Sequence, residues 1–373
     1  MSSRFVLFDN TAITGTGYIF AMVNRMQMLY YILILPKHLM HPYMILGIIG
    51  VGILSQINLL ILSYYLKSNY SSQGYLGFVQ LFGERLVRLF AFFGLFVILV
   101  KVIVTALGYV EIIHQFMFPS MKTSWLIFFL MATSFYIASQ GMEKTIRLGL
   151  IAFLATIWII VLYVPYFLPP LAQIHHLYPL VPGEISIHSW YGFLMIWSAL
   201  SGPEYLVCLG PWIGPKEKIL KGLSIGNALS VIEYLILFVA CLLYFGSNYL
   251  EKISFPVVNM LRYLQSPVFE RIDLIIISLI MIYVLFLIAL LLLYFYGAVR
   301  IAAGRIKVPT NRKGFLGSAA AIFICMLIID GWYWREGKEL NILTTLQLWL
   351  GAITYFLVPS FLLIAMKWKR GSS

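Results

Sequence analysis

The chain has 373 residues, of which 61% are hydrophobic and only 11% are charged. A soluble domain carries about a quarter charged residues, so a water-soluble fold is excluded, and the long continuous apolar runs exclude a membrane β-barrel, whose strands alternate. The formal net charge of +12 then reflects loop topology, and we expect no nucleic-acid partner.

Ten apolar segments follow one another along the chain, each close to the length of about 20 residues that crosses a bilayer as a helix. They cover roughly residues 13–35, 43–66, 88–113, 123–139, 147–168, 188–210, 222–246, 273–297, 315–333 and 343–366. The connections between them are short. We therefore predict an all-α polytopic membrane protein that forms a single domain over residues 1–373.

The distribution of Lys and Arg predicts how these segments are oriented. Seventeen of them lie at one set of segment ends, together with the two termini, and seven lie at the opposite ends. Because cytoplasmic loops are enriched in Lys and Arg, both termini should be cytoplasmic, and loops 36–42, 169–187 and 247–272 should face outward. Residues 255–265 are too short to span, so they should form an interfacial helix or a lid over an outward vestibule. No cleavable signal peptide is expected.

Four ionisable residues lie well inside the predicted spans, away from their ends: Arg25, Lys101, Glu204 and Glu233. Each costs about 2.5–3.5 kcal/mol at the centre of a membrane helix, and such residues usually mark ligand, ion or proton sites. Lys101, Glu204 and Glu233 are therefore candidates for a proton or ion pathway. The alternative is that the two cations and two anions pair inside the bundle and only fix its packing.

The sixth segment contains Ser201-Gly202-Pro203-Glu204 in its middle. Proline lacks an N–H group and clashes with the preceding turn, and a broken membrane helix offers its free N–H and C=O groups to a ligand. We predict a small-molecule site that includes Ser198, Ser201, Gly202, Pro203 and Glu204. A simple proline kink is the alternative.

A matching break is expected in the first segment if the chain is a five-plus-five inverted repeat. The equivalent place is residues 23–28, which are polar but contain no Gly or Pro. Asn24, Arg25 and Gln27 are the candidate ligand-binding residues there. In the third segment, Lys101 shares a helix face with Thr105 at i+4. Lys101 can exchange a proton near neutral pH or act as a standing cation opposite Glu204.

The sequence contains no pattern that predicts metal binding, cofactor binding or catalysis. Cys208, Cys241 and Cys325 lie in apolar runs without metal-ligand spacing, which is typical of small buried hydrophobes. The pair His175 and His176 has no further Cys, His or carboxylate ligands near it. There is no nucleophile–base pairing, so we expect no enzyme activity, no metal and no cofactor.

Several motifs, in order and at consistent spacing, resemble those of the spore-germination permeases. They are Leu33–Pro36, Ser72–Gly83, the G-x-E-x-x-x-R pattern of Gly141, Glu143 and Arg147, the L-x-P-x-x-x-G pattern of Leu177–Gly183, and the stretch from Phe255–Arg262 to Phe269–Asp273. These permeases are the membrane-embedded B subunits of nutrient germinant receptors, within the amino acid–polyamine–organocation superfamily. The resemblance covers about residues 20 to 366.

The resemblance implies a fold and a ligand site. The fold would be a 5+5 inverted repeat, with about residues 13–168 and 188–366 as its halves and with helices 1 and 6 broken. Gly202 and Glu204 align with a G-x-E of the sixth helix. The ligand would bind between helices 1, 3, 6 and 8, which adds Lys101, Thr105 and Ser278. The chain departs from the family at residues 24–27, where glycines are usual.

The resemblance also implies a function. The chain would sense a nutrient, an amino acid or a nucleoside, together with a membrane-anchored A subunit and a lipoprotein C subunit, in the spore inner membrane. The alternative is a proton-coupled amino acid or polyamine transporter of the same fold, and a third possibility is an ion-conducting component.

Overall fold

The computed structural model describes residues 7–8, 15–179, 187–213, 218–263, 271–306, 308–334 and 341–371, and these contain helices and no β-strand. The motifs predicted at residues 177–183 and 269–273 lie partly outside this range. Eight helical segments are long and apolar enough to cross a membrane. They are α3 (Met44–Leu66), α6 (Glu84–Phe116), α8 with η1 (Met142–Phe167), Trp190–Trp212 of α9 with η3, α10 (Ile219–Phe245), α13 (Ile272–Ala302), α14 (Arg312–Trp332) and α15 (Ile342–Gly371).

The predicted class, an all-helical polytopic membrane protein, is confirmed, and each of the ten predicted segments falls on a helix. The predicted number of ten spans is not confirmed. Length and composition give eight spans, or nine when α1 (Thr16–Arg25) and α2 (Leu29–Leu39) are taken as one bent span. The segment predicted at 123–139 forms α7 (Thr123–Ser139), which has 17 residues. At 1.5 Å per residue this is about 26 Å, slightly short of a hydrocarbon core of about 30 Å.

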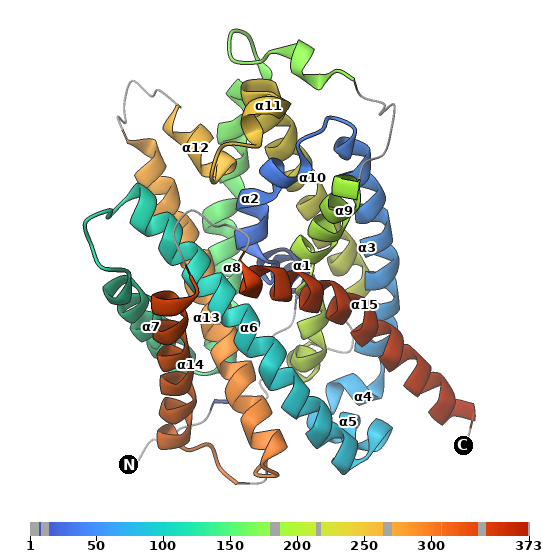
Figure 1. The fold of residues 1–373 in the computed structure, drawn as a ribbon. Helices are drawn as coiled ribbons and strands as arrows, with labels where there is room; N and C mark the ends of the chain where they lie inside the picture. Colours follow the sequence, from blue (N-terminus) through green and yellow to red (C-terminus); the bar gives the residue numbers. More distant parts are fainter. Residues whose placement is uncertain are drawn as a thin grey trace.

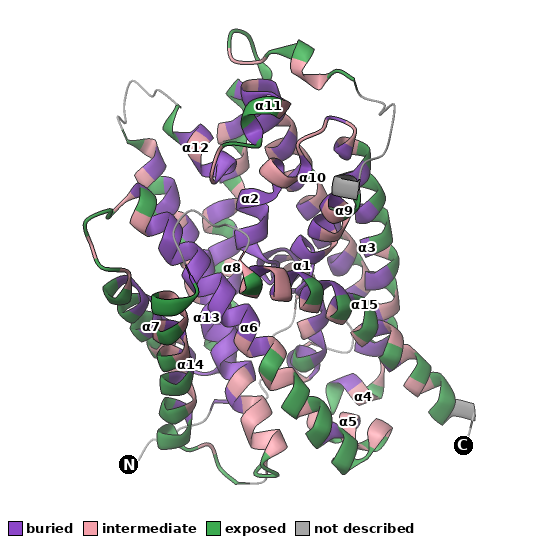
Figure 2. Ribbon diagram, in the orientation of Figure 1, coloured by how far each residue is buried: buried purple, intermediate pink, exposed green. Residues whose placement is uncertain are grey.

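The two longest helices, α6 and α13, pack along one another through the middle of the bundle (Figure 1). Buried residues concentrate on these two helices and on α1 and α2, whereas the peripheral helices α7, α14 and α15 carry wide exposed faces (Figure 2). Those faces are apolar: Phe129 of α7 is 55% exposed, Trp332 of α14 is 73% exposed and Phe356 of α15 is 56% exposed. Continuous exposed apolar surface of this kind suits contact with lipid.

Short helices lie at both ends of the bundle. The helices α4 (Asn69–Ser72) and α5 (Tyr75–Phe82) follow α3 at one end, and α11 (Ser247–Leu250) and α12 (Pro256–Arg262) follow α10 at the other (Figure 1). The helix α12 occupies the segment predicted to be an interfacial helix or a lid. Most of it is buried against α2, α10 and α13, as a lid would be.

Aromatic ring packing and hydrogen bonds from tyrosine hydroxyls hold α12 in place. Phe255, which precedes α12, is fully buried, with its ring packed edge-on against those of Tyr30 and Phe116. The hydroxyl of Tyr163 donates to the Val257 carbonyl at 2.9 Å, and the hydroxyl of Tyr166 donates to the Met260 carbonyl. These contacts close the end of the bundle above α2.

Candidate functional site

The first predicted span is broken near its middle. The helix α1 ends at Arg25, α2 begins at Leu29, and the two axes differ by 53°. Asn24, Arg25 and Gln27 are 1%, 5% and 1% exposed. The predicted break is therefore present although it contains neither Gly nor Pro.

The sixth span is broken at the predicted place. The helix α9 (Ile187–Ala199) ends before Gly202, and the chain continues from Pro203 as a 3₁₀ helix, η3 (Pro203–Trp212). Gly202 has a φ of +142°, and a Cβ there would lie 2.0 Å from the Met26 carbonyl oxygen. Only glycine adopts such a conformation readily. The segment is thus a true interruption of the helix and not a simple proline kink.

The two breaks lie directly against each other. The Met28 N–H donates to the Ala199 carbonyl at 3.3 Å. The Tyr234 hydroxyl lies 2.8 Å from Gln27 Oε1 and 3.0 Å from the Ala199 oxygen, and the Tyr283 hydroxyl donates to the Gln27 carbonyl at 3.0 Å. Backbone groups freed by the breaks are therefore paired inside the protein, as a membrane interior requires.

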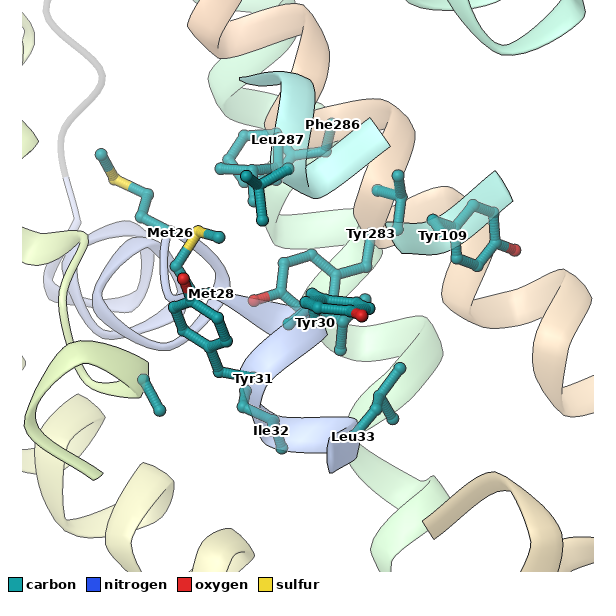
Figure 3. Packing of buried hydrophobic residues seen from close by; sticks show 14 of the residues in the cluster. Met26, Met28, Tyr30, Tyr31, Ile32, Leu33, Tyr109, Tyr283, Phe286 and Leu287 are labelled. Carbon is teal, nitrogen blue, oxygen red and sulfur yellow. The ribbon is translucent and has the colours of Figure 1, made fainter. Parts of the chain in front are cut away.

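Apolar side chains surround the first break closely. Figure 3 shows Met26, Met28, Tyr30 and Tyr31 of the first span packed beside side chains of α6 and α13, among them Tyr283. All five are at most 2% exposed. This packing excludes water from the break, so the polar groups inside it depend on protein partners or on a ligand.

Lys101 lies at the break of the first span, and Glu204 lies at the break of the sixth span. The Lys101 ammonium donates to the Met26 carbonyl at 3.3 Å and lies 4.5 Å from the centre of the Tyr205 ring. Glu204 Oε2 accepts from the Gly202 N–H at 2.5 Å, and Oε1 is 3.5 Å from the Thr354 hydroxyl. A cation thus faces the carbonyl end of α1 and an anion faces the N–H end of η3, which is the favourable sign at each helix end.

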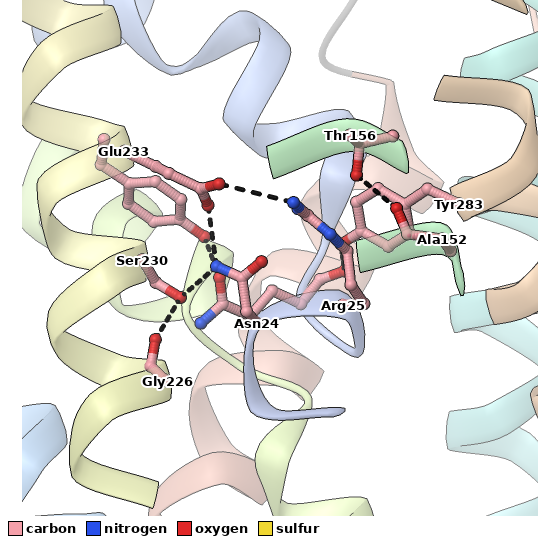
Figure 4. A network of polar contacts seen from close by, with 10 residues as sticks. Asn24, Arg25, Ala152, Thr156, Gly226, Ser230, Glu233 and Tyr283 are labelled. Atoms are coloured by element: carbon pink, nitrogen blue, oxygen red, sulfur yellow. Dashed lines mark hydrogen bonds and ion pairs between the residues drawn. The ribbon is translucent and has the colours of Figure 1, made fainter. Parts of the chain in front are cut away.

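The other two intramembrane charges pair with each other (Figure 4). Arg25 Nη2 is 3.5 Å from Glu233 Oε1, and Asn24 donates to Glu233 Oε2 at 2.7 Å and to the Ser230 hydroxyl at 2.9 Å. The Arg25 guanidinium also lies 5.0 Å from the centre of the Tyr283 ring. This arrangement fixes the end of α1 to α10 and supports the packing interpretation for Arg25 and Glu233.

Arg25→Met should destabilise the protein strongly, because it leaves the Glu233 carboxylate, 13% exposed, without its cation. Removing one partner of a buried ion pair costs about 3–5 kcal/mol. Glu233→Gln should cost a similar amount, and the double variant should recover much of the loss. We would measure this in a double-mutant cycle by thermal unfolding in detergent.

The exposed pair Glu84 and Arg88, at 2.6 Å, provides the control. The equivalent cycle there, with Arg88→Met and Glu84→Gln, should give a coupling of at most about 1 kcal/mol. If the Arg25 and Glu233 losses simply added, the two residues would not act as a pair.

The remaining predicted residues divide into two groups. Thr105 is buried, with its hydroxyl 3.7 Å from Met28 Sδ, and Ser198 and Ser201 are fully buried near the end of α9. Ser278, in contrast, is exposed and donates to the Leu274 carbonyl within α13. The inward face of α13 is formed by Ile277, Ile280 and Tyr283 instead, so we do not include Ser278 in the site.

The sequence reasoning missed several polar residues around the breaks. Tyr205, Tyr234 and Tyr283 contact the freed backbone or Lys101, and Gln347 and Thr354 of α15 lie near the sixth break. Tyrosines are too frequent in this chain, at 24, for the type alone to mark a site. The spacing of Gln347 and Thr354 within an apolar helix was a usable signal.

One prediction about cysteine is corrected. Cys241 is buried, but Cys208 is exposed on η3 and Cys325 is partly exposed. None of the three is placed in the breaks.

A small cavity lies away from the breaks, between the first part of α1, α8 and η3. Its volume is about 20 Å³, and it is lined by apolar side chains such as Met22, Ile146 and Leu206. This is room for about one water molecule. The breaks themselves are joined by the hydrogen bond from the Met28 N–H to the Ala199 carbonyl, so a nutrient could enter between them only if they separated, and the structure is a closed arrangement of the site.

Comparison with known proteins identifies relatives of the chain. A family model described as "Spore germination protein" matches residues 19–331. The spore germination protein GerQB of Bacillus cereus is 27% identical over 179 residues, which is 46% of each chain. The match thus spans less than half the length of that relative.

Proposed function

Because the chain belongs to the spore germination protein family, we propose that it is the nutrient-sensing membrane subunit of a germination receptor, and that its ligand binds between the broken helices 1 and 6. One observation carries this proposal. The two breaks meet at mid-span, and each holds a buried charge of the sign that its helix end favours. Buried charges at broken helices at this depth are typical of small-molecule sites.

Sensing follows from the closed state of the site. A nutrient, an amino acid or a nucleoside, separates the breaks and contacts Asn24, Gln27 and the 198–204 segment, while Lys101 and Thr105 of α6 form a wall. Such a ligand shifts the equilibrium only if it binds the open arrangement more tightly than the closed one. Partner subunits then read the change.

The order of elements supports an inverted repeat, with residues 13–168 and 188–366 as its halves. Each half has a broken helix, then a long helix, then two short helices, then a helix of 33 or 31 residues. The short pairs lie at opposite ends of the bundle (Figure 1), as an inverted repeat demands. The α4–α5 end carries Lys67, Arg85 and Arg88, which supports a cytoplasmic position for that end and for both termini.

We expect two partners, a larger membrane-anchored A subunit and a lipoprotein C subunit, in the spore inner membrane. Family membership and the similarity to a spore germination protein of Bacillus cereus support this assignment.

The test of the proposal is thermal stabilisation of the purified full-length chain by a panel of L-amino acids and nucleosides. A ligand that binds the folded state at 100 times its Kd stabilises it by about 2.7 kcal/mol. We expect at least one compound to raise the apparent melting temperature in a saturable way. If none did so, with the chain alone or assembled with its partners, the site between the breaks would not be a nutrient site.

The transporter alternative draws support from Lys101, whose ammonium occupies the half-helix end where broken-helix transporters hold their coupling cation. Uptake of a stabilising compound into proteoliposomes under a proton gradient separates the two functions. We expect binding without uptake, and without conductance in planar bilayers.

A further inference from the structure

The helix α15 turns a polar face towards the break of the sixth span. Gln347, Gly351 and Thr354 are spaced i, i+4 and i+7, so they lie on one side of the helix. This helix packs against both α9 and η3. The segment from Ser198 to Glu204 therefore runs along a polar strip of α15.

Three polar side chains converge on Gly351. A Cβ at that position would lie 2.8 Å from Ser198 Oγ, 2.8 Å from Ser201 Oγ and 3.4 Å from Gln347 Nε2. The lack of a side chain at Gly351 is what allows these groups to face a common point.

Two acceptors near this point have no partner in the part of the chain that the structure describes: the hydroxyl oxygen of Ser198 and the amide oxygen of Gln347, whose amide nitrogen is the atom nearest Gly351. Ser198 is 0% exposed and Gln347 is 1% exposed, and neither Ser198 Oγ nor Gln347 Oε1 has a hydrogen-bond partner within the described parts of the chain. A buried polar atom without a partner costs about 1–3 kcal/mol. Native proteins keep few such atoms, and two on adjoining helices at one point indicate a place for a donor.

The neighbouring carboxylate is also incompletely paired. Glu204 is 3% exposed, and its Oε1 has only the Thr354 hydroxyl at 3.5 Å, whose proton has a closer acceptor in the Leu350 carbonyl at 2.8 Å. No ion pair joins Glu204 to a cation among the described residues. The Lys101 ammonium donates to the Met26 carbonyl instead, although its charge is close enough to attract the carboxylate.

We propose that Ser198, Gln347 and Glu204 form a subsite for a primary ammonium group of the nutrient, for which Gly351 makes room. An ammonium group brings three N–H donors and one positive charge. These match the unpaired hydroxyl oxygen of Ser198, the amide oxygen of Gln347 once its amide turns towards the point, and the incompletely paired carboxylate of Glu204. The proposal rests on the proposed function and narrows it: the nutrient is an amine, such as an amino acid, and not a nucleoside.

The test compares each stabilising L-amino acid with its 2-hydroxy acid and its N-acetyl derivative, using thermal stabilisation of the purified full-length chain. Both analogues keep the carboxylate and side chain but lack the ammonium group. They should bind at least about tenfold more weakly, because a site built for a polar group rejects analogues that lack it.

Gly351→Ala should remove stabilisation by amino acids, since the new methyl group would lie 2.8 Å from two hydroxyl oxygens. The matched control is Gly317→Ala in α14, where a Cβ meets nothing within 4 Å. Both substitutions gain a similar helix propensity of about 1 kcal/mol, so only the filling of the subsite separates them. Ser198→Ala, which adds no atom, provides a second variant should Gly351→Ala not fold.

The possible outcomes distinguish failure of the proposed subsite from failure of the proposed function. If nucleosides stabilise the chain and amino acids do not, the ammonium subsite is wrong and the proposed function stands. If sodium or potassium chloride alone, compared with choline chloride, gives a shift that Gly351→Ala removes, the subsite holds an inorganic cation and the proposal is overturned. If no compound stabilises the chain, alone or assembled with its partners, both fail.

Discussion

Gly202→Ala should destabilise the folded chain by at least about 3 kcal/mol. A Cβ at this position would lie 2.0 Å from the carbonyl oxygen of Met26, which is backbone and cannot rotate away. The φ of +142° adds strain for any residue with a side chain. Relief requires the two breaks to separate, with loss of the bond from the Met28 N–H to the Ala199 carbonyl.

The measurement is the apparent melting temperature in detergent, together with the monodisperse fraction after purification. Gly94→Ala in α6 is the control, because a Cβ at Gly94 meets nothing within 4 Å. We expect this variant to melt at or slightly above the wild-type temperature. A Gly202→Ala variant that melts like the wild type would mean that the breaks do not touch in the folded protein.

The two breaks differ in how far the sequence could predict them. In the sixth span, Gly202 and Pro203 break the helix by their own backbone chemistry, so the sequence located the break and its carboxylate. In the first span, residues 24–27 include no helix breaker. Its bend depends on partners from other helices, Lys101 on the Met26 carbonyl and Tyr283 on the Gln27 carbonyl, and such long-range contacts leave no local pattern.

The pairing of the charged residues also depends on long-range contacts that the sequence does not reveal. The sequence placed four charges in the membrane but left open which of them pair, since pairing depends on which helices are neighbours. Arg25 on α1 finds Glu233 on α10, 208 residues away. Ser278 was assigned to the site from its position in the eighth span, but the rotation of α13 turns it outward.

The spacing of Gln347 and Thr354 gave a signal for α15 in the sequence, but the role of Gly351 could not be read from the chain. Gly351 is one of 28 glycines, and its role depends on two serines about 150 residues earlier. The predicted number of ten spans is not confirmed either, because α7 is a little shorter than a membrane span.

Glu204→Gln should abolish or weaken the nutrient response at least about tenfold, because loss of one partner from a buried charged contact costs several kcal/mol. The amide keeps the shape of the side chain and an oxygen that can accept from the Gly202 N–H. Membrane insertion should be unaffected or improved, since a neutral side chain costs less at mid-span. The response is measured as the ligand concentration that gives half-maximal thermal stabilisation, beside the amount of chain recovered from membranes.

One further variant separates the charge of Glu204 from its hydrogen bond, and a second variant is the control. Glu204→Ala removes both, so it should lose the nutrient response and also lower the melting temperature without ligand, because the buried Gly202 N–H loses its acceptor. Glu84→Gln, on the exposed start of α6, should change neither quantity. A Glu204→Gln variant that responds at unchanged ligand concentration, while Glu204→Ala is unstable, would make Glu204 a cap for the broken helix and place nutrient recognition elsewhere in the bundle.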